Sequence, residues 1–352
     1  MRFADNRNKI GKYIPAVVFL IFIYGMALWF IFSPKPDYSS SEKRYLQKFP
    51  EVTAEKLLSG DFGSEFETFF ADRFPQRNTW VGLNAYTALA EGNNGASGVY
   101  NCKNGYLINK PVSTENNLDK NIGAVADFAK SIDTPTTVML VPSTGYIVDD
   151  VLPTFHDKYN DDEDISKISS TLSKDKIGFV DLRERFKSEY KNGSQLYYKT
   201  DHHWTTKGAY TGYQELCKAF DITPIDDSTL KKDSYPDFYG TTYSSSGFWL
   251  TPPDNIEIWN NPKNSDRNIS VKITEGANIK TSGSMYFTDH LKEDDKYPVF
   301  IDGNHALTEI TNTNAKNGTI LLIKDSFSHS LAPFLAENYS KVVLVDLRYY
   351  KE

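Results

Sequence analysis

A run of 20 residues without a charged side chain, Tyr13 to Phe32, constrains this 352-residue chain more than any other feature of its sequence. A helix rises about 1.5 Å per residue, so such a run spans about 30 Å, the thickness of the hydrocarbon core of a bilayer. A helix buried in a soluble core is rarely this long and apolar beside a basic flank. The run therefore predicts a transmembrane helix over residues 13–32.

The residues before this run predict its orientation. Four basic side chains (Arg2, Arg7, Lys9 and Lys12) stand against one acidic side chain, Asp5. By the positive-inside rule, residues 1–12 stay in the cytoplasm and the rest of the chain is exported. A cleaved signal peptide is the close alternative, but its apolar region has about 7–15 residues and ends at small side chains. The longer run here ends in bulky residues 29–32, which favours an uncleaved single-pass anchor in the cell membrane.

Charge and cysteine content exclude some classes of protein. The whole chain has a formal charge of −7, and the part after residue 32 keeps 35 basic and 45 acidic residues. Because nucleic-acid binders usually carry a basic surplus, we expect no nucleic-acid partner. Cys102 and Cys217 are able to form one disulfide in an oxidising compartment or to remain buried thiols. A domain of about 300 residues has core enough without a disulfide, which favours free thiols.

The exported part is predicted to be an α/β domain. Residues 33–41 are rich in proline and serine, as is typical of a linker, and residues 42–352 are expected to form one extracytoplasmic domain. Short apolar strands alternate with amphipathic helices, which indicates a parallel sheet with helices on both faces. Between about 222 and 310 the pattern changes to a β-rich insertion. The expected helices include 76–91, 115–131, 165–172, 205–220 and 327–338, and the expected strands include 137–141, 177–180, 319–323 and 341–345, a hairpin over 99–108, and β-segments at 239–243, 248–250, 256–259, 271–273 and 299–301.

Ser326 is the first candidate for chemistry. It follows the apolar strand 319–323 and precedes a helix, so it lies at the carboxyl edge of the sheet, where α/β folds place their sites. The free backbone N–H groups of that helix are suited to stabilise an oxyanion. The alternative is structural: Asp325 or Ser326 simply caps the helix.

The segment Thr200-Asp201-His202-His203-Trp204 supplies the groups that a serine nucleophile needs. A serine hydroxyl requires a neighbouring base, and the base requires a third group that holds its tautomer. In an extended segment, residues i and i+2 point to the same side. This spacing nominates His203 as the base and Asp201 as its orienter, with His202 pointing away. Surface histidines or a helix cap at Thr200-Asp201 remain alternatives.

Other residues are weaker candidates. A metal site would use the same Asp and His side chains, but His156, His290, His305 and His329 are scattered singly, so we expect no metal. Gly303-Asn304 follows the segment 299–301 and is a candidate oxyanion donor, although an Asn-Gly pair is more often a plain turn. Three further residues are candidates for contact with the substrate: Ser143, His202 and Trp204.

The same residues resemble a known family. Thr200 to Trp204 match the signature of the bacterial DHHW proteins, and Lys324-Asp325-Ser326-Phe327 is similar to their second block. Segments 60–62, 72–77 and 105–107 extend the resemblance. The family is similar to the SGNH-hydrolase-like proteins that O-acetylate alginate and related polysaccharides, in which an Asp-x-His segment precedes the serine. The resemblance implies an SGNH-like fold, with Ser326 as nucleophile, His203 as general base and Asp201 as orienter.

The resemblance also implies a function and a partner. It predicts an enzyme that acetylates an extracytoplasmic polysaccharide through an acetyl-serine and receives the acetyl group from a membrane-bound MBOAT-type acyltransferase. No cofactor is expected. Aromatic side chains of the insertion (Tyr239, Tyr243, Trp249 and Trp259) are suited to stack on sugars, although such residues are more often part of a core. Two alternatives stay open: a carbohydrate acetyl esterase with the same triad, and a non-catalytic envelope protein whose three side chains do not converge.

Overall fold

The computed structural model describes residues 2–112, 117–175 and 177–351, and side chains within the first helix from Lys12 onward. Met1 of the predicted cytoplasmic segment, the first residues of the predicted helix 115–131 and Glu352 lie outside the described residues. The chain divides into two compact units, residues 1–84 and 85–352. A single domain over residues 42–352 therefore stays a prediction.

The first unit is built around α1 (Arg2–Phe32), within which Lys12–Phe32 have a mean hydropathy of 2.4. Of the helices in the described part of the chain, α1 is the one long and apolar enough to cross a membrane, a test that a signal sequence also passes. The predicted linker is ordered, because Arg73 donates hydrogen bonds to the carbonyls of Lys35 and Pro36 and to the carboxylate of Asp37. The remaining elements are β1 (Tyr38–Ser39), β2 (Arg44–Tyr45), α2 (Ala54–Ser59), α3 (Asp61–Asp72) and α4 (Arg77–Ala90), which belongs to the second unit from Ala85 onward.

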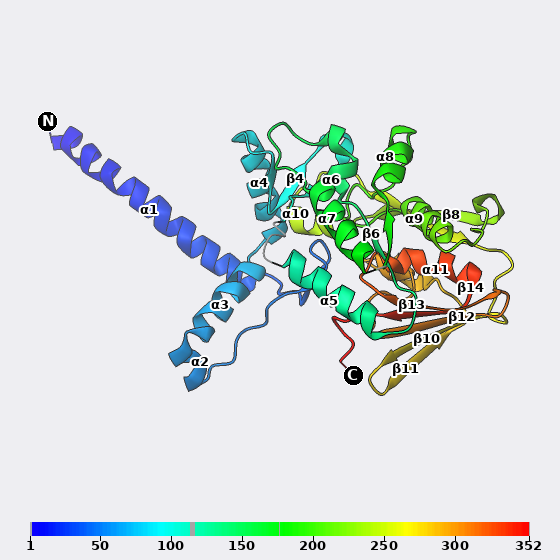
Figure 1. The fold of residues 1–352 in the computed structure, drawn as a ribbon. Helices are drawn as coiled ribbons and strands as arrows, with labels where there is room; N and C mark the ends of the chain where they lie inside the picture. The colour runs from blue at the N-terminus through cyan, green and yellow to red at the C-terminus, as the bar shows by residue number, and fades with distance from the viewer. Residues whose placement is uncertain (1, 113–116, 176, 352) are drawn as a thin grey trace. The chain divides into compact units, whose positions relative to one another are not determined.

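The second unit alternates strands and helices much as expected (Figure 1). Its strands are β3 (Gly95–Ala96), β4 (Val99–Asn101), β5 (Leu107–Asn109), β6 (Thr137–Leu140), β7 (Gly178–Asp181), β8 (Lys231–Phe238), β9 (Asp254–Asn260), β10 (Ile269–Glu275), β11 (Asn278–Ser282), β12 (Leu307–Asn312), β13 (Asn317–Ile323) and β14 (Tyr339–Val345). Its helices are α5 (Leu118–Ser131), α6 (Thr144–Ile147), α7 (Asp161–Lys174), α8 (Arg183–Lys191), α9 (Thr206–Ala219), α10 (Thr241–Ser246) and α11 (Ser328–Asn338).

The sheet differs from the single parallel sheet that the sequence predicts. Parallel pairing occurs between β6 and β7 and between β13 and β14, but these pairs belong to different sheets. The larger sheet has the order β11-β10-β12-β14-β13, and its other three pairings are antiparallel. Strands joined by a short turn, as β10 and β11 are, can only pair antiparallel. The fold is therefore mixed α/β.

The insertion is also different from its prediction. Its strands β10 and β11 extend the larger sheet through β12, so this region is continuous with the core. Residues 239–243, predicted as a β-segment, instead lead into helix α10, and residues 299–301 end a 3₁₀ turn, Tyr297–Val299. The segment 299–301 is short and apolar, and such a run does not distinguish a strand from a buried helical turn. In the segment 239–243, Thr241 begins α10 directly after Gly240.

Helices cover one face of the larger sheet. Alternate residues of β10, β12 and β14 are buried on that face, against α11 and, beyond it, α9. On β13, Leu321 and Ile323 are 55% and 48% exposed, so the prediction of helices on both faces is wrong for this strand. Cys102 and Cys217 are buried and unpaired, which confirms the expected free thiols.

Candidate active site

Ser326 lies in the turn between β13 and α11, as the sequence predicts. The carboxylate of Asp325 accepts a hydrogen bond from the N–H of Phe327 at 3.0 Å, so Asp325 closes this turn. The hydroxyl of Ser326 instead lies 2.7 Å from Nε2 of His203. The N–H of Ser326 donates to no group in the described part of the chain. Ser326 therefore has both a base and a free backbone donor beside it.

The Asp201–His203 pair comes from a turn. Oδ1 of Asp201 accepts from the backbone N–H of His203 at 2.8 Å and lies 2.5 Å from its Nδ1. Both residues are buried. The prediction of an extended segment is therefore wrong, although the two side chains meet as expected. The alternative that Thr200 or Asp201 caps α9 is also wrong, because Thr205 accepts from the N–H of Gly208 there.

Asp201 is held from its other side by the segment before α10. Its Oδ2 accepts from the N–H of Thr241 at 2.7 Å and from the Thr241 hydroxyl at 3.2 Å. A Cβ on Gly240 would lie 2.1 Å from the Cβ of Asp201, so only glycine fits there. Burial alone raises the pKa of Asp201, but the charge of His203 and its hydrogen bonds outweigh burial and hold that pKa well below its usual range. Asp201 is thus an ionised, fully bonded carboxylate.

Two rings enclose the imidazole of His203. The ring of Tyr297 stacks on it with centroids 4.0 Å apart and planes 11° from parallel. The ring of His202 lies 3.9 Å away at 35°. Two rings that each lie about 4 Å from the same imidazole occupy its opposite faces. The Tyr297 hydroxyl also donates to the carbonyl of Ser326 at 3.3 Å, so this tyrosine contacts both the base and the serine.

His202 does not point away from the site, as the extended segment predicted. Its Nδ1 lies 2.6 Å from the hydroxyl of Thr241, and its side chain is 37% exposed. Burial lowers the pKa of His202, and the neighbouring His203 lowers it further, although Asp201 opposes the shift. His202 is therefore a neutral, partly accessible group beside the base.

Trp204 is fully buried, which removes it as a substrate contact. Its indole N–H reaches the carbonyl of Phe327 at 3.0 Å and the hydroxyl of Ser330 at 2.9 Å. These bonds tie the first turn of α11 to the segment that carries Asp201 and His203. Trp204 therefore fixes the position of Ser326 relative to its base.

The candidate oxyanion donors Gly303 and Asn304 already have other hydrogen-bond partners. The register of β12, β14 and β13 brings the residues before Leu307 to the same sheet edge as Ser326. However, the N–H of Gly303 already donates to the carbonyl of Phe300, and the side-chain oxygen of Asn304 accepts from Arg348. Ser143 lies at the amino end of α6, where its N–H donates to Asp161. No hydrogen bond in the described part of the chain joins these three residues to Ser326 or His203.

A buried cation supports the Ser326 turn. Nζ of Lys324 lies 3.0 Å from the carboxylate of Asp346 and 2.8 Å from Nε2 of His329. Burial lowers the pKa of Lys324 and, more strongly, that of His329. Lys324 belongs to the second block of the DHHW resemblance, whereas its partners His329 and Asp346, like Thr241 and Tyr297, carry no signal for this role in the sequence.

The donor atoms of Asp201, His202 and His203 lie within 4.8 Å of one another, a spacing that would allow a metal ion. Both oxygens of Asp201 and both ring nitrogens of His203 are engaged by protein groups. The donor set therefore fits a hydrogen-bonded chain from Asp201 to Ser326 better than a metal.

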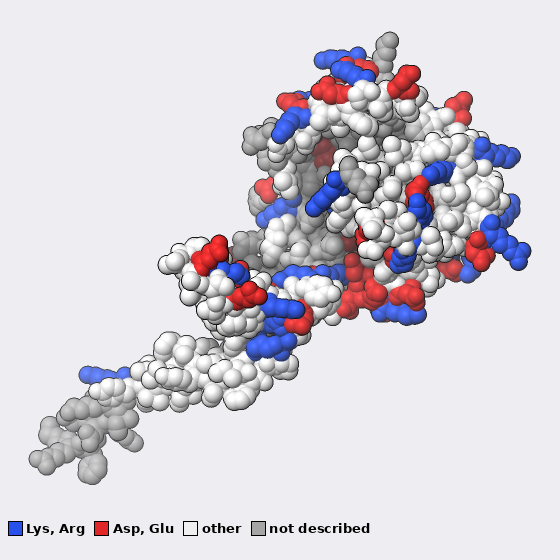
Figure 2. Space-filling model, turned by 90° about the horizontal axis from the view of Figure 1, so that it is seen from below, with Lys and Arg blue, Asp and Glu red and all other residues white. Residues whose placement is uncertain are grey.

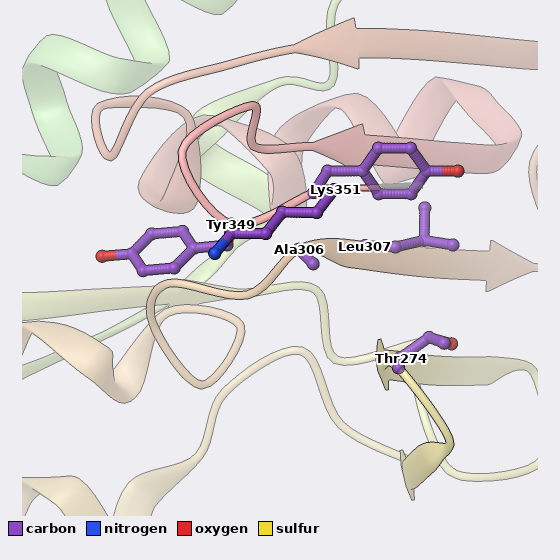
Figure 3. A pocket seen from close by; sticks show the side chains of 7 residues that line it. Thr274, Ala306, Leu307, Tyr349 and Lys351 are labelled. Atoms are coloured by element: carbon purple, nitrogen blue, oxygen red, sulfur yellow. The ribbon is translucent and has the colours of Figure 1, made fainter.

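A separate pocket of about 250 Å³ lies at the start of β12 (Figure 3). Its lining comes from β10 and its turn, from the start of β12 and from the chain after β14: Thr274, Gly276, Ala306, Leu307, Tyr349, Tyr350 and Lys351. None of these residues is a candidate from the sequence, and the pocket has no paired nucleophile and base.

The geometry can be compared with that of known proteins. No curated protein matches the chain. Among solved structures, a DHHW family protein from Eubacterium siraeum is similar, with 19% identity, a TM-score of 0.59, and coverage of 73% of this chain and 85% of the other. Bacillus cereus PatB1 with a sulfonyl adduct is 20% identical, with a TM-score of 0.58 and coverage of 71% and 86%. The O-acetyltransferase domain of Pseudomonas putida AlgJ is 13% identical, with a TM-score of 0.43 and coverage of 69% and 78%.

The first two likenesses show a common fold. The family model described as DHHW protein matches residues 105–345, which include the Asp201–His203 turn, the Gly240-Thr241 support and the Ser326 turn. On that match, the chain belongs to the DHHW protein family.

Proposed function

We propose that this chain is a membrane-anchored O-acetyltransferase that moves an acetyl group through Ser326 to a hydroxyl of an extracytoplasmic polysaccharide. The observation that carries the proposal is the hydrogen-bonded chain from Asp201 through His203 to Ser326. This order of groups activates a serine for acyl transfer. The non-catalytic alternative expects these side chains to stay apart, so the geometry does not favour it.

The proposed reaction has two acyl transfers. In the first, Nε2 of His203 takes the Ser326 proton while the serine oxygen attacks the acetyl carbonyl of the donor. The donor's leaving group then departs with that proton, which leaves acetyl-Ser326. In the second, a sugar hydroxyl gives its proton to His203 and attacks the acetyl carbonyl. The Ser326 oxygen leaves and recovers the proton, so the enzyme is unchanged.

Charge develops at two places during each step. The imidazolium of His203 is stabilised by the ionised Asp201 and by the face of Tyr297, whose ring is well placed for a cation–π contact. The oxyanion forms next to Ser326, whose free N–H is suited to receive it. The same two features would serve hydrolysis, so the fate of the acetyl group depends on the acceptor that reaches it.

The acceptor side of the proposal is supported by three aromatic rings beside Thr241. Tyr239 and Tyr243 have centroids 4.3 Å apart, and Tyr243 lies 5.1 Å from Trp249. All three are half-buried, a state that leaves part of each ring open to a sugar. Trp259 is buried against Phe334, so of the two alternatives for this residue the structure favours a place in the core.

The location and the acetyl donor are part of the same proposal. The basic residues before the apolar run Tyr13–Phe32, at the amino end of α1, support export of everything after Phe32, with residues 1–12 in the cytoplasm. Acetyl-CoA is cytoplasmic, so the group would have to cross the membrane. A membrane-bound MBOAT-type acyltransferase is the proposed donor partner, and α1 would keep the two proteins in one membrane.

The experiment uses the full-length chain in detergent with an activated acetyl ester. We expect the intact mass to rise by one acetyl group, and peptide mapping to place that group on Ser326. His203→Ala should abolish this labelling, whereas Ser143→Ala, the matched change at the other strand-end serine, should leave the mapped site at Ser326. Labelling of Ser326 that is equally fast without His203 would refute the proposed chemistry.

A second arm tests the acceptor. Acetylated oligosaccharide formed after addition of sugar supports the transferase, and free acetate alone supports the esterase alternative. Trp249→Ala should raise the sugar concentration needed for half-maximal transfer and leave the first acetylation step unchanged. An unchanged sugar dependence would remove the aromatic rings from the acceptor site.

A further inference from the structure

A cluster of phenylalanine rings joins the end of α1 to α3 within the first unit. Phe30, in the last turn of α1, has its ring centroid 4.7 Å from that of Phe70 and 6.3 Å from that of Phe69. Phe49 continues the cluster with edge contacts to Phe62, Phe66 and Phe69 at 6.5, 6.1 and 5.4 Å. The apolar face of α3 is therefore packed directly against the end of the membrane-spanning segment.

Several apolar side chains in this cluster and in the neighbouring helix α2 are exposed. Leu58 is 89% exposed, and Phe49 and Leu57 are more than half exposed. The exposed apolar side chains, named here the α2–α3 apolar surface, are Phe49, Val52, Leu57, Leu58, Phe66 and Phe70. Exposed apolar patches of this kind in soluble surroundings are unfavourable and usually mark a contact surface.

Contacts between α3 and the end of α1 fix the depth at which the α2–α3 apolar surface would meet a membrane. Arg73 is 5% exposed and binds the carbonyls of Lys35 and Pro36, which follow α1, while it also binds the carbonyl of Gln47. Nζ of Lys35 lies 4.1 Å from the Phe30 ring centroid, a cation–π contact that also ties the chain after α1 to this ring. These contacts hold α3 against the last turn of α1. A membrane that contains α1 must therefore meet Phe70 at the depth of Phe30.

The opposite side of α3 is polar. Glu67 and Thr68 are exposed there, and Glu65 pairs with Lys56 of α2. Acidic residues outnumber basic ones over residues 51–72, the range that holds α2 and α3: Glu51, Glu55, Asp61, Glu65, Glu67 and Asp72 stand against Lys56. Attraction to anionic lipid therefore does not explain the surface, and apolar insertion is the remaining source of affinity. Figure 2 shows α1 from Lys12 onward as a rod that is almost entirely free of charged groups.

From these contacts we propose that the α2–α3 apolar surface lies in the bilayer interface, in the leaflet where the carboxyl end of α1 emerges. The occupant of the surface is lipid, and the helices α2 and α3 lie along the membrane with their polar side toward water. This inference rests on the proposed membrane anchor and is independent of the proposed chemistry at Ser326.

The test places a polarity-sensitive NBD fluorophore on single introduced cysteines of the full-length chain. The chain is studied as one copy per nanodisc of phosphatidylcholine, with and without doxyl-labelled lipid as quencher. Leu58→Cys and Phe66→Cys probe the surface, Thr68→Cys is the matched control on the polar side, and Phe22→Cys probes the middle of the apolar run 13–32 of α1. The native cysteines are buried, and burial raises the pKa of Cys102 to about 12 and of Cys217 to about 11, so mild labelling should spare them.

We expect the probes at positions 58 and 66 to lose fluorescence on interfacial doxyl lipid, while the probe at 68 keeps it. Loss at position 22 alone would overturn the inference and leave the anchor in place. Equal loss at 58, 66 and 68 would also overturn it, because it shows no preferred side. No loss at position 22 would refute the anchor and the inference together. Acetylation of Ser326 is not measured, so none of these outcomes bears on the chemistry.

Discussion

Replacing Asp201 by Asn tests the electrostatic part of the site with little change in shape. Oδ1 of Asp201 lies 2.5 Å from Nδ1 of His203, and the two side chains are 2% and 5% exposed. When His203 takes the Ser326 proton, two opposite unit charges face each other there. At an effective dielectric constant of about 20, suited to a buried pair, charges about 4 Å apart attract by about 4 kcal/mol. In bulk water the same pair would gain only about 1 kcal/mol.

The two attraction energies predict different losses of acetylation rate in Asp201→Asn. At about 1.4 kcal/mol for each factor of ten, the buried pair corresponds to a loss of about a thousand-fold in Asp201→Asn, and the water value to about five-fold. The change in hydrogen bonding should also slow acetylation in Asp201→Asn. Asp201 accepts four hydrogen bonds, from His203 and Thr241, and an Asn amide must direct N–H donors at one of those partners. If the amide faces His203, the imidazole proton moves to Nε2, which then no longer accepts from Ser326.

The measurement is the burst rate of acetylation by p-nitrophenyl acetate in the full-length chain. Asp157→Asn is the matched control, because that carboxylate bonds Tyr100 and has no contact with Asp201. Thermal unfolding of each variant reports whether the fold is kept. A loss below ten-fold in a folded Asp201→Asn protein would refute the argument that its charge stabilises the imidazolium.

Four further predictions follow from the same structure. Ser326→Ala should remove the acetyl-enzyme completely, whereas Asp201→Ala should keep measurable labelling in intact mass spectra; an equal loss would count against an orienting role. Gly240→Ala should displace Asp201 and cost about 1–3 kcal/mol in denaturant unfolding, and wild-type stability and labelling would contradict this. Unfolded His329 binds a proton from about pH 6.5 downward while burial keeps the folded form neutral, so stability should fall with acid by up to about 1.4 kcal/mol per pH unit. His329→Gln should make that slope shallower, and an unchanged slope would place the acid sensitivity elsewhere. Reductant should leave the unfolding temperature unchanged because Cys102 and Cys217 are unpaired, and a lower temperature would reveal a disulfide.

The elements of the fold were predictable because most carry strong local signals. The hairpin at residues 99–108, the strand before Ser326 and the helix after Thr205 form where the apolar pattern places them. The pairing of strands was not predictable in the same way. An apolar run such as β13 is typical of a strand buried on both faces, yet Leu321 and Ile323 are 55% and 48% exposed. Sheet order depends on contacts between distant segments, which periodicity does not report.

The residues that hold Asp201 and His203 in place could not be predicted from the sequence, for a related reason. Thr241 and Tyr297 lie 40 and 96 positions after Asp201 in the chain and become neighbours only in the fold. Each is an ordinary residue in a short segment, and neither belongs to a motif with its own chemistry. Gly240 is the partial exception: a glycine inside a segment that the sequence predicts as a strand is a sign of close backbone approach, and here that approach is to Asp201.

The Asp201–His203 spacing predicted that these two side chains meet, although the segment that carries them is a turn and not extended. Both conformations bring the two side chains together. An extended segment brings residues i and i+2 to one side, but a turn closed by an Asp side chain does so too. In the turn, Oδ1 of Asp201 accepts the N–H of His203 as well as contacting its ring, so the carboxylate is fixed by the same residue that it orients. The turn also brings His202 back beside the base, with Thr241 bridging its Nδ1 and Asp201. An extended segment would have sent His202 to the opposite side, so the turn explains why two adjacent histidines both reach this site.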